Sequence, residues 1–237
     1  VKISNLIIKD QNAPRKDLRI LYGGVNFINS KVNIDSLLVI NSKAEDAVNF
    51  IDSKVLANSI SVKNASSDAI DSDNSKIKIN SLNCEKIGND CLDLSFSIGE
   101  VNDMEASNVG DKGVSLGEKS FLNLNNFNIK NSEIGVVSKD SSTLKLNSMT
   151  HTNVKLTFSA YIKKDEFGSP SIIINNLIPK ENTNYLIGED TDAFIFGSKI
   201  TSKLSSKQVE GLLYGNNYGV KTIRRWGMRE SLNLKEV

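Results

Sequence analysis

Two stretches decide the fold of this chain: KVLANSISVKNAS at residues 54–66 and KIKINSLNCEKIG at residues 76–88. Each places apolar side chains three residues and one residue before a central Asn, and two and four residues after it. A spacing of two is the side-chain period of a β-strand, so each stretch predicts two short strands with apolar residues facing inward. At the Asn, the alternation of inward and outward side chains shifts by one residue. We therefore expect the chain to bend there, because Asn tolerates left-handed backbone angles.

The same pattern recurs along most of the chain at a step of 22 or 23 residues. The central polar residues of the regular part are Asp35, Asn58, Asn80, Asn102, Asn125 and Asn147, with Ser4 and Asn175 extending the series at its ends. A third strand follows each pair of strands, with small residues at Ala47, Ala69, Cys91, Gly113 and Gly135, each followed by an apolar residue. Three short strands in a repeat of this length indicate a parallel β-helix, because leucine-rich repeats need another pattern and propellers need longer repeats.

The sequence therefore predicts an all-β fold, a single-stranded parallel β-helix of about eight coils of about 22 residues. Residues 1–200 form the β-helix, and residues 201–237 form a C-terminal cap with a short helix and a tail. A cap is expected because an open end exposes unpaired strand edges. Within SSKQVEGLLYG (residues 205–215), Ser205 or Ser206 caps the helix and Gly215 follows its end.

The repeat over residues 1–200 resembles the right-handed parallel β-helix superfold of pectate-lyase-like proteins. Four motifs also look like β-helical modules of bacterial proteins that carry CotH-like or lamin-tail domains: SSDAIDSD (66–73), GNDCLDLS (88–95), GDKGVSLGEKS (110–120) and SEIGVVSKDSS (132–142). The resemblance implies a right-handed coil, in line with the general preference of parallel crossovers. It also implies an extracellular or cell-envelope location and flanking domains of the same polypeptide.

Composition excludes several classes of protein. The chain has 29 Asn and 30 Ser but only one His and two Cys, and its net charge is +1. The balanced charge removes the electrostatic basis for binding nucleic acid, and the absence of a long apolar run argues against membrane insertion. Abundant Ile and Val exclude a disordered chain.

Equivalent residues of stacked coils lie roughly 4.8 Å apart, so the central column predicts a ladder of side-chain hydrogen bonds. Its members are Asp35, Asn58, Asn80, Asn102, Asn125, Asn147 and Asn175, and we assign them a structural role. Cys84 and Cys91 fall in buried columns and are expected to be free thiols, with a disulfide or metal pair as the less favoured alternative. His151 occupies an inward position, which makes it a poor candidate for catalysis.

Carboxylates gather on the third strand. Asp46, Asp68 and Asp90 follow one another at steps of 22, and Lys112 continues this column. Asp71 and Asp93 form a second acidic column, three residues after Asp68 and Asp90. Three interpretations remain: a solvated acidic face, a Ca²⁺ site at Asp71 and Asp93, or an acid/base pair acting on a polysaccharide. Pectinolytic hydrolases use several Asp and a nearby His, which is missing here, and Lys112 is the only nearby base for a lyase. We therefore assign no catalytic residue; the alternative set is Asp68, Asp71, Asp90, Asp93 and Lys112.

Two insertions interrupt the repeat, DQNAPRKDLRI at residues 10–20 and YIKKDEFGSP at residues 161–170. Loops on a rigid scaffold often determine specificity. The candidate contacts for a partner are Tyr161, Lys163, Lys164, Asp165 and Glu166, with a plain connecting loop as the alternative. The segment RRWGMRESLNLKEV (224–237) is expected to pack on the cap or to lead into a further domain.

The sequence thus favours a non-catalytic scaffold or binding module of a larger bacterial surface or envelope protein. Its partner would be a carbohydrate or another protein, and no cofactor other than Ca²⁺ is expected. The alternative function is a polysaccharide lyase, hydrolase or epimerase that uses the acidic residues of the third strand. A trimeric fibre would need an apolar stripe on an outer face, which the sequence lacks.

Overall fold

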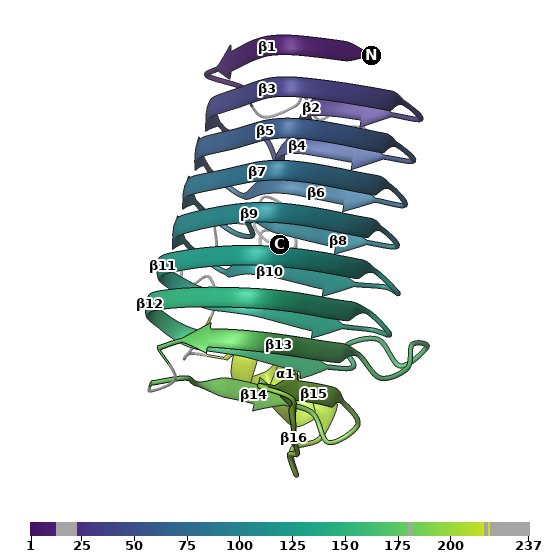
Figure 1. Ribbon diagram of the computed structural model, residues 1–237, viewed down its shortest axis with the longest axis vertical. Helices are drawn as coiled ribbons and strands as arrows, with labels where there is room; N and C mark the ends of the chain where they lie inside the picture. Colours follow the sequence, from purple (N-terminus) through teal and green to yellow (C-terminus); the bar gives the residue numbers. More distant parts are fainter. Residues whose placement is uncertain (13–22, 180–181, 216–217, 219–237) are drawn as a thin grey trace, which may run out of the picture.

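The computed structural model describes residues 1–12, 23–179, 182–215 and 218. The chain is a parallel β-solenoid of about eight turns whose equivalent positions lie roughly 22 residues apart, as predicted (Figure 1). Each coil has three sides. In the coil that begins at Lys54, side one comprises residues 54–57, side two residues 59–65, and side three residues 68–73.

Sides one and two form one bent strand in every coil. These long strands are β1 (Lys2–Lys9), β3 (Lys31–Ser42), β5 (Lys54–Ala65), β7 (Lys76–Ile87), β9 (Ile98–Val109), β11 (Phe121–Lys139), β12 (Thr143–Tyr161) and β13 (Ser171–Ile178). Side three is a short strand in the earlier coils: β2 (Gly23–Ile28), β4 (Asp46–Ile51), β6 (Asp68–Asp73), β8 (Leu92–Ser95) and β10 (Lys112–Gly117). In the next two coils, side three is the last part of β11 and β12, which pair with β10 and β14 there.

The core is built from the columns that the periodicity predicts. In β5, Val55, Ala57, Ile60 and Val62 are buried, and the parity changes between them because Asn58 and Ser59 both point outward. The neighbouring strand β7 stacks directly on these residues, with Val55 opposite Ile77. Burial of each large aliphatic side chain contributes about 1.5–3 kcal/mol, so the stacked columns are the main source of stability.

The prediction that the central Asn adopts left-handed angles is wrong. The left-handed residues lie six positions later, at Asn41, Asn64, Lys86, Asn108, Asn131 and Asn153, with φ between 52° and 60°. A shallow bend between sides one and two needs only extended angles, so it stays within one strand. The tight corner between sides two and three needs a left-handed residue, which Asn supplies more readily than most residues.

Both columns form ladders of amide hydrogen bonds. In the central column, Asn125 Nδ2 donates to Asn102 Oδ1 at 2.9 Å and Asn58 Nδ2 lies 3.5 Å from Asp35 Oδ1. In the left-handed column, Asn64 Nδ2 donates to Asn41 Oδ1 at 2.7 Å. This second ladder was not predicted, although its Asn residues recur at the same step in the sequence.

The expectation of free thiols is also wrong, because Cys84 and Cys91 form a disulfide. Cys84 is an inward residue of side two and Cys91 lies at the start of side three of the same coil, so the two residues face each other inside the corner that joins these sides. Both are fully buried. The repeat relates a residue to its equivalents in neighbouring coils, so the periodic pattern carries no signal for a contact between two sides of one coil.

The C-terminal part continues with β14 (Tyr185–Ile187), β15 (Asp192–Ile195), β16 (Ser198–Ile200) and helix α1 (Ser206–Leu213). Strand β16 pairs antiparallel with β15 and ends the parallel ladder. Ser205 is the N-cap, with a capping box to Gln208, and Gly215 follows the C-cap residue as predicted.

Helix α1 packs on the outer face of side three near the C-terminal end of the solenoid (Figure 1). Its buried Val209 and Leu213 pack against Ile134, Val137 and Leu156, which are outward residues of side three. The outward column of side three reads Asn49, Asp71, Asp93, Ser115, Val137, Ser159, and of these only Val137 offers the helix an apolar contact. Most of the first insertion and the segment 224–237 lie outside the described residues. No helix in the described ranges has the length and apolar character needed to cross a bilayer.

The disulfide is expected to stabilise the coil that contains it. The preceding coil holds Val62 and Ala69 at the equivalent positions, so Cys84→Val with Cys91→Ala replaces the disulfide by a pair that the fold already accommodates. We expect the double variant to fold with a free energy of unfolding lower by about 2–3 kcal/mol, measured by urea denaturation. A reducing agent should lower the stability of the parent and leave the variant unchanged. Equal stability of the oxidised parent and the variant would contradict a stabilising role.

Candidate functional site

The acidic column of side three is tied to the backbone of the following coil. Asp68 Oδ1 accepts hydrogen bonds from the backbone nitrogen of Asp90 at 2.7 Å and from Asn89 Nδ2 at 2.6 Å. Asp90 Oδ1 in turn accepts from the backbone nitrogen of Lys112 at 3.0 Å. These two candidate carboxylates therefore act as links between coils.

Lys112 lies in a buried ion-pair cluster. Its Nζ is 2.6 Å from Asp111 Oδ2 and 3.4 Å from Asp90 Oδ1. Two neighbouring carboxylates favour the charged ammonium, whereas a lyase base must be deprotonated. The cluster therefore suits Lys112 to a structural ion pair better than to proton abstraction.

Asp71 and Asp93 lie directly opposite each other in β6 and β8. Burial raises the pKa of Asp71 well above its ordinary value, and the charges of Asp46 and Asp93 raise it further. Burial also raises the pKa of Asp46 to about 7, with Glu45 adding to the effect. Over the described part of the chain, no group of three or more His, Cys, Asp or Glu side chains is arranged to hold a metal ion. Two carboxylates alone are a poor fit for Ca²⁺, which takes six to eight oxygen ligands.

The second insertion folds back onto the solenoid. The backbone nitrogens of Lys163 and Lys164 both donate to Asp140 Oδ1, at 2.7 and 2.9 Å. The ammonium of Lys164 also pairs with the carboxylate of Glu118. Asp165 and Glu166 are exposed at the tip of the loop. The loop is therefore anchored against the corner between side three and side one of the next coil.

Tyr161 is not part of this loop surface, contrary to its place among the candidate contacts. It ends β12, is fully buried, and belongs to the apolar cluster beneath helix α1. Its hydroxyl donates to the hydroxyl of Tyr214 at 3.3 Å. The helix that buries Tyr161 comes from more than forty residues later in the chain, so the local sequence did not reveal its burial.

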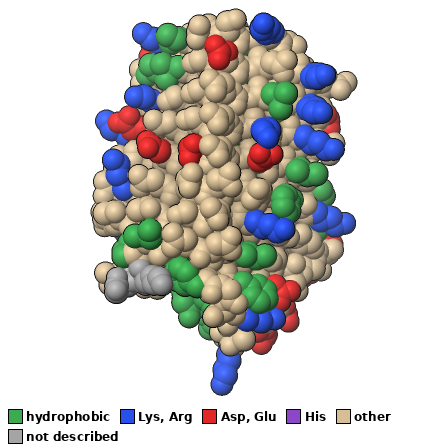
Figure 2. Space-filling view, viewed as in Figure 1, with side chains coloured by type: hydrophobic (Ala, Val, Ile, Leu, Met, Phe, Trp, Pro, Cys, Tyr) green, Lys and Arg blue, Asp and Glu red, His purple; other side chains and the backbone are tan. Residues whose placement is uncertain are grey.

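The outer face of sides one and two mixes apolar and charged side chains, and a hollow of about 340 Å³ on side one is lined by Leu56, Ile98 and Phe121 together with lysines. Figure 2 shows hydrophobic side chains on this face as separate patches among polar, basic and acidic ones. The exposed apolar residues of side one include Leu56 and Ile98, which lie in different coils. Lys78 and Glu100 form an ion pair at 2.7 Å nearby.

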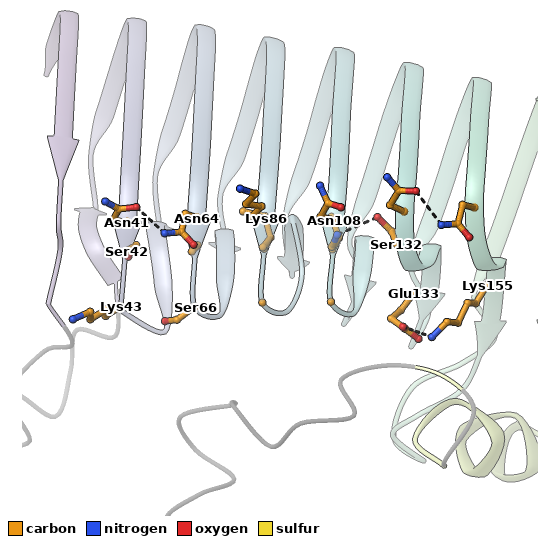
Figure 3. A pocket seen from close by; sticks show the side chains of 17 residues that line it. Asn41, Ser42, Lys43, Asn64, Ser66, Lys86, Asn108, Ser132, Glu133 and Lys155 are labelled. Carbon is orange, nitrogen blue, oxygen red and sulfur yellow. Dashed lines mark hydrogen bonds and ion pairs between the residues drawn. The ribbon is translucent and has the colours of Figure 1, made fainter.

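A groove of about 820 Å³ runs along the corner between sides two and three, and sequence reasoning did not identify it (Figure 3). It spans six successive coils, from Asn41 to Asn153, and the left-handed column lines it throughout its length, with Asn in five coils and Lys86 in the sixth. Gly88 and Gly110 belong to its lining, and a Cβ at Gly88 would lie 2.2 Å from the backbone oxygen of Ser66. Glycine is required there because the stacked corners approach each other closely.

The groove has a polar and basic chemical character. Lys43 and Lys86 are exposed at its edge, and neither forms an ion pair within the described residues. Lys155 pairs with Glu133, whose second carboxylate oxygen is buried without a hydrogen-bond partner. Amides, hydroxyls and ammonium groups bind hydroxyl-bearing and anionic ligands, so the groove suits a polar polymer.

Comparison with known proteins identified no relative. No family model matches the chain, and neither a curated protein nor a solved structure matches it.

The raised pKa of Asp71 predicts a pH dependence of stability. The carboxyl ionises more easily in the unfolded chain, so its contribution to stability is lost as the pH rises from the ordinary Asp pKa through the raised folded value. Asp71→Asn should remove this loss. We expect a melting temperature about 2–4 °C above the parent at pH 8 and no difference at pH 4, measured by differential scanning calorimetry.

The matched control is Asp35→Asn, which places the usual residue of the central column at an exposed position. This control should leave the slope of melting temperature against pH unchanged. The same slope in Asp71→Asn and in the parent would show that ionisation of Asp71 does not destabilise the fold.

Proposed function

We propose that this chain is a non-catalytic binding module whose ligand is an acidic polysaccharide lying along the corner groove. The observation that carries the proposal is the shape of the groove, which crosses six coils and presents the same polar column in each. Coils recur about every 4.8 Å, so the polar groups of this column, five amides and the ammonium of Lys86, recur at a regular spacing along the groove. A linear polysaccharide also presents hydroxyl groups at a regular spacing, and one ligand could therefore contact several coils.

The charge of the groove favours an acidic ligand. Lys43 and Lys86 carry positive charges that no neighbouring described carboxylate balances, whereas Lys155 is neutralised by Glu133. An ammonium group bonds a carboxylate more strongly than a neutral hydroxyl. A uronic-acid polymer satisfies both the lysines and the amides.

The contacts on side three give less support to the enzymatic alternative. Asp68 and Asp90 accept backbone hydrogen bonds, and the ammonium of Lys112 is held between two carboxylates. Asp71 and Asp93 are left as the pair that could act on a polysaccharide as acid and base. A lyase, hydrolase or epimerase that used them would therefore work without the other members of the predicted set.

We further propose an extracellular or cell-envelope location for the module. The buried Cys84–Cys91 disulfide supports this location, because disulfides persist in oxidising compartments and are rare in the cytosol. The resemblance of the repeat to β-helical modules of bacterial surface proteins points the same way.

Binding of polygalacturonate and alginate, compared with neutral dextran, tests the proposal by isothermal titration calorimetry. We expect the parent to bind at least one acidic polymer, more weakly as salt concentration rises. Lys43→Ala with Lys86→Ala should weaken binding about tenfold or more, because two charge-assisted contacts are lost. The matched control, Lys54→Ala with Lys76→Ala on side one, removes the same charge outside the groove and should bind normally.

Two results would overturn the proposal. The first is equal loss of binding in both double variants, which would indicate attraction by net charge alone. The second is cleavage of the acidic polymer by the parent, abolished in Asp71→Asn with Asp93→Asn, which would establish the enzymatic alternative.

A further inference from the structure

Two aromatic side chains stand on the solenoid surface at a different corner from the groove. Phe96 follows β8, at the corner between side three and side one of the next coil, and its side chain is 54% exposed. Phe167 of the second insertion packs against it, with ring centroids 6.0 Å apart and planes tilted by 58°. The pair is formed by residues of two distant coils, and neither residue belongs to the buried core.

Phe96 interrupts a polar column. The equivalent positions in neighbouring coils hold Asp52, Asn74 and Glu118, and Asn74 Nδ2 donates to Asp52 Oδ1. Phe96 has a φ of 50°, a left-handed angle that Asn and Asp adopt far more readily than an aromatic residue. The chain thus places an aromatic ring where both the backbone and the ladder favour a small polar residue.

Packing does not account for this choice, since more than half of the Phe96 side chain is open to solvent. Residues that conflict with their local conformation cluster at functional sites, so the left-handed Phe96 points to a functional role for this corner. The loop that carries Phe167 is fixed by Lys164 and Glu118, so the two rings are held in place before any ligand arrives.

The polar groups around the rings indicate the class of ligand. Asp73 lies close enough to Glu118 and Asp52 for their charges to raise its pKa, although burial is the larger cause. Among the described residues, Glu118 is paired with Lys164 and lies within reach of the charge of Lys139, while Asp52 and Asp73 add two further carboxylates. Carboxylates accept hydrogen bonds without donating them. This surface favours a ligand with hydroxyl donors and an apolar face, and it disfavours an anion. A neutral sugar meets these requirements, because the C–H face of a pyranose stacks on an aromatic ring while its hydroxyls bond carboxylates.

We propose that Phe96 and Phe167 form a second carbohydrate site, separate from the corner groove, that binds a neutral pyranose unit. The site differs from the groove in its corner of the coil, in its aromatic contacts and in the sign of its charge. The proposal does not depend on whether the groove binds an acidic polymer.

The test compares three neutral hexasaccharides, of glucose, mannose and galactose, with a hexasaccharide of galacturonic acid as probes. Binding is measured by saturation-transfer NMR and by titration calorimetry on the full chain. The decisive variant is Phe96→Asn, because Asn is the ladder residue of the preceding coil and suits the left-handed angle. We therefore expect it to fold with an equal or higher melting temperature.

The parent is expected to bind at least one neutral hexasaccharide, and Phe96→Asn should weaken that binding about tenfold. Phe196→Asn is the matched control, since Phe196 is also exposed and left-handed but lies in the turn after β15, outside this pair. Lys43→Ala with Lys86→Ala should leave neutral binding unchanged. This result separates failure of the aromatic site from failure of the groove.

Two outcomes would overturn the aromatic site. One is that no neutral hexasaccharide binds the parent. The other is that Phe96→Asn binds as well as the parent while the loop at residues 162–170 becomes more sensitive to protease, which would assign Phe96 the role of a loop anchor.

Discussion

Parallel backbone pairing between coils is the constraint on which the rest of this structure depends. Because β5 pairs with β7 from Lys54 opposite Lys76 to Ala65 opposite Ile87, every side chain is stacked on the residue one repeat later. Inward columns must then be mostly apolar or small, and an insertion must project from the coil as a loop. The longer step between Asn147 and Asn175 illustrates this rule, since the extra residues form the loop while Ser148 still pairs with Asn176.

The corners of the coil differ in how the backbone turns, and this difference determines the surface. A shallow bend leaves the central ladder exposed on a strand, whereas the tight corner after side two needs left-handed residues such as Asn64 and close-packed glycines such as Gly88. The tight corner is the one that borders the groove. The third corner uses the same left-handed geometry, and there Phe96 replaces a polar ladder residue.

Side three changes character along the solenoid. Its outward column is acidic at Asp71 and Asp93 and becomes apolar at Val137, where helix α1 packs. The polar part forms the ion pairs and the hydrogen bonds that link one coil to the next. The apolar part packs against the helix, which buries Tyr161. Side three therefore carries ion pairs and hydrogen bonds between coils in one part and the contact surface for the C-terminal helix in another.

The sequence by itself determined the solenoid, its step, the inward columns and a helix capped at Ser205 or Ser206, because each of these follows from local or strictly periodic spacing; the structure selects Ser205. It did not determine the Cys84–Cys91 disulfide or the contact of Phe167 with Phe96. Periodicity compares equivalent positions in adjacent coils, whereas those contacts join non-equivalent positions across one coil or between a loop and a distant corner. The groove likewise depends on how tightly the stacked corners approach, which only the closed three-sided coil decides.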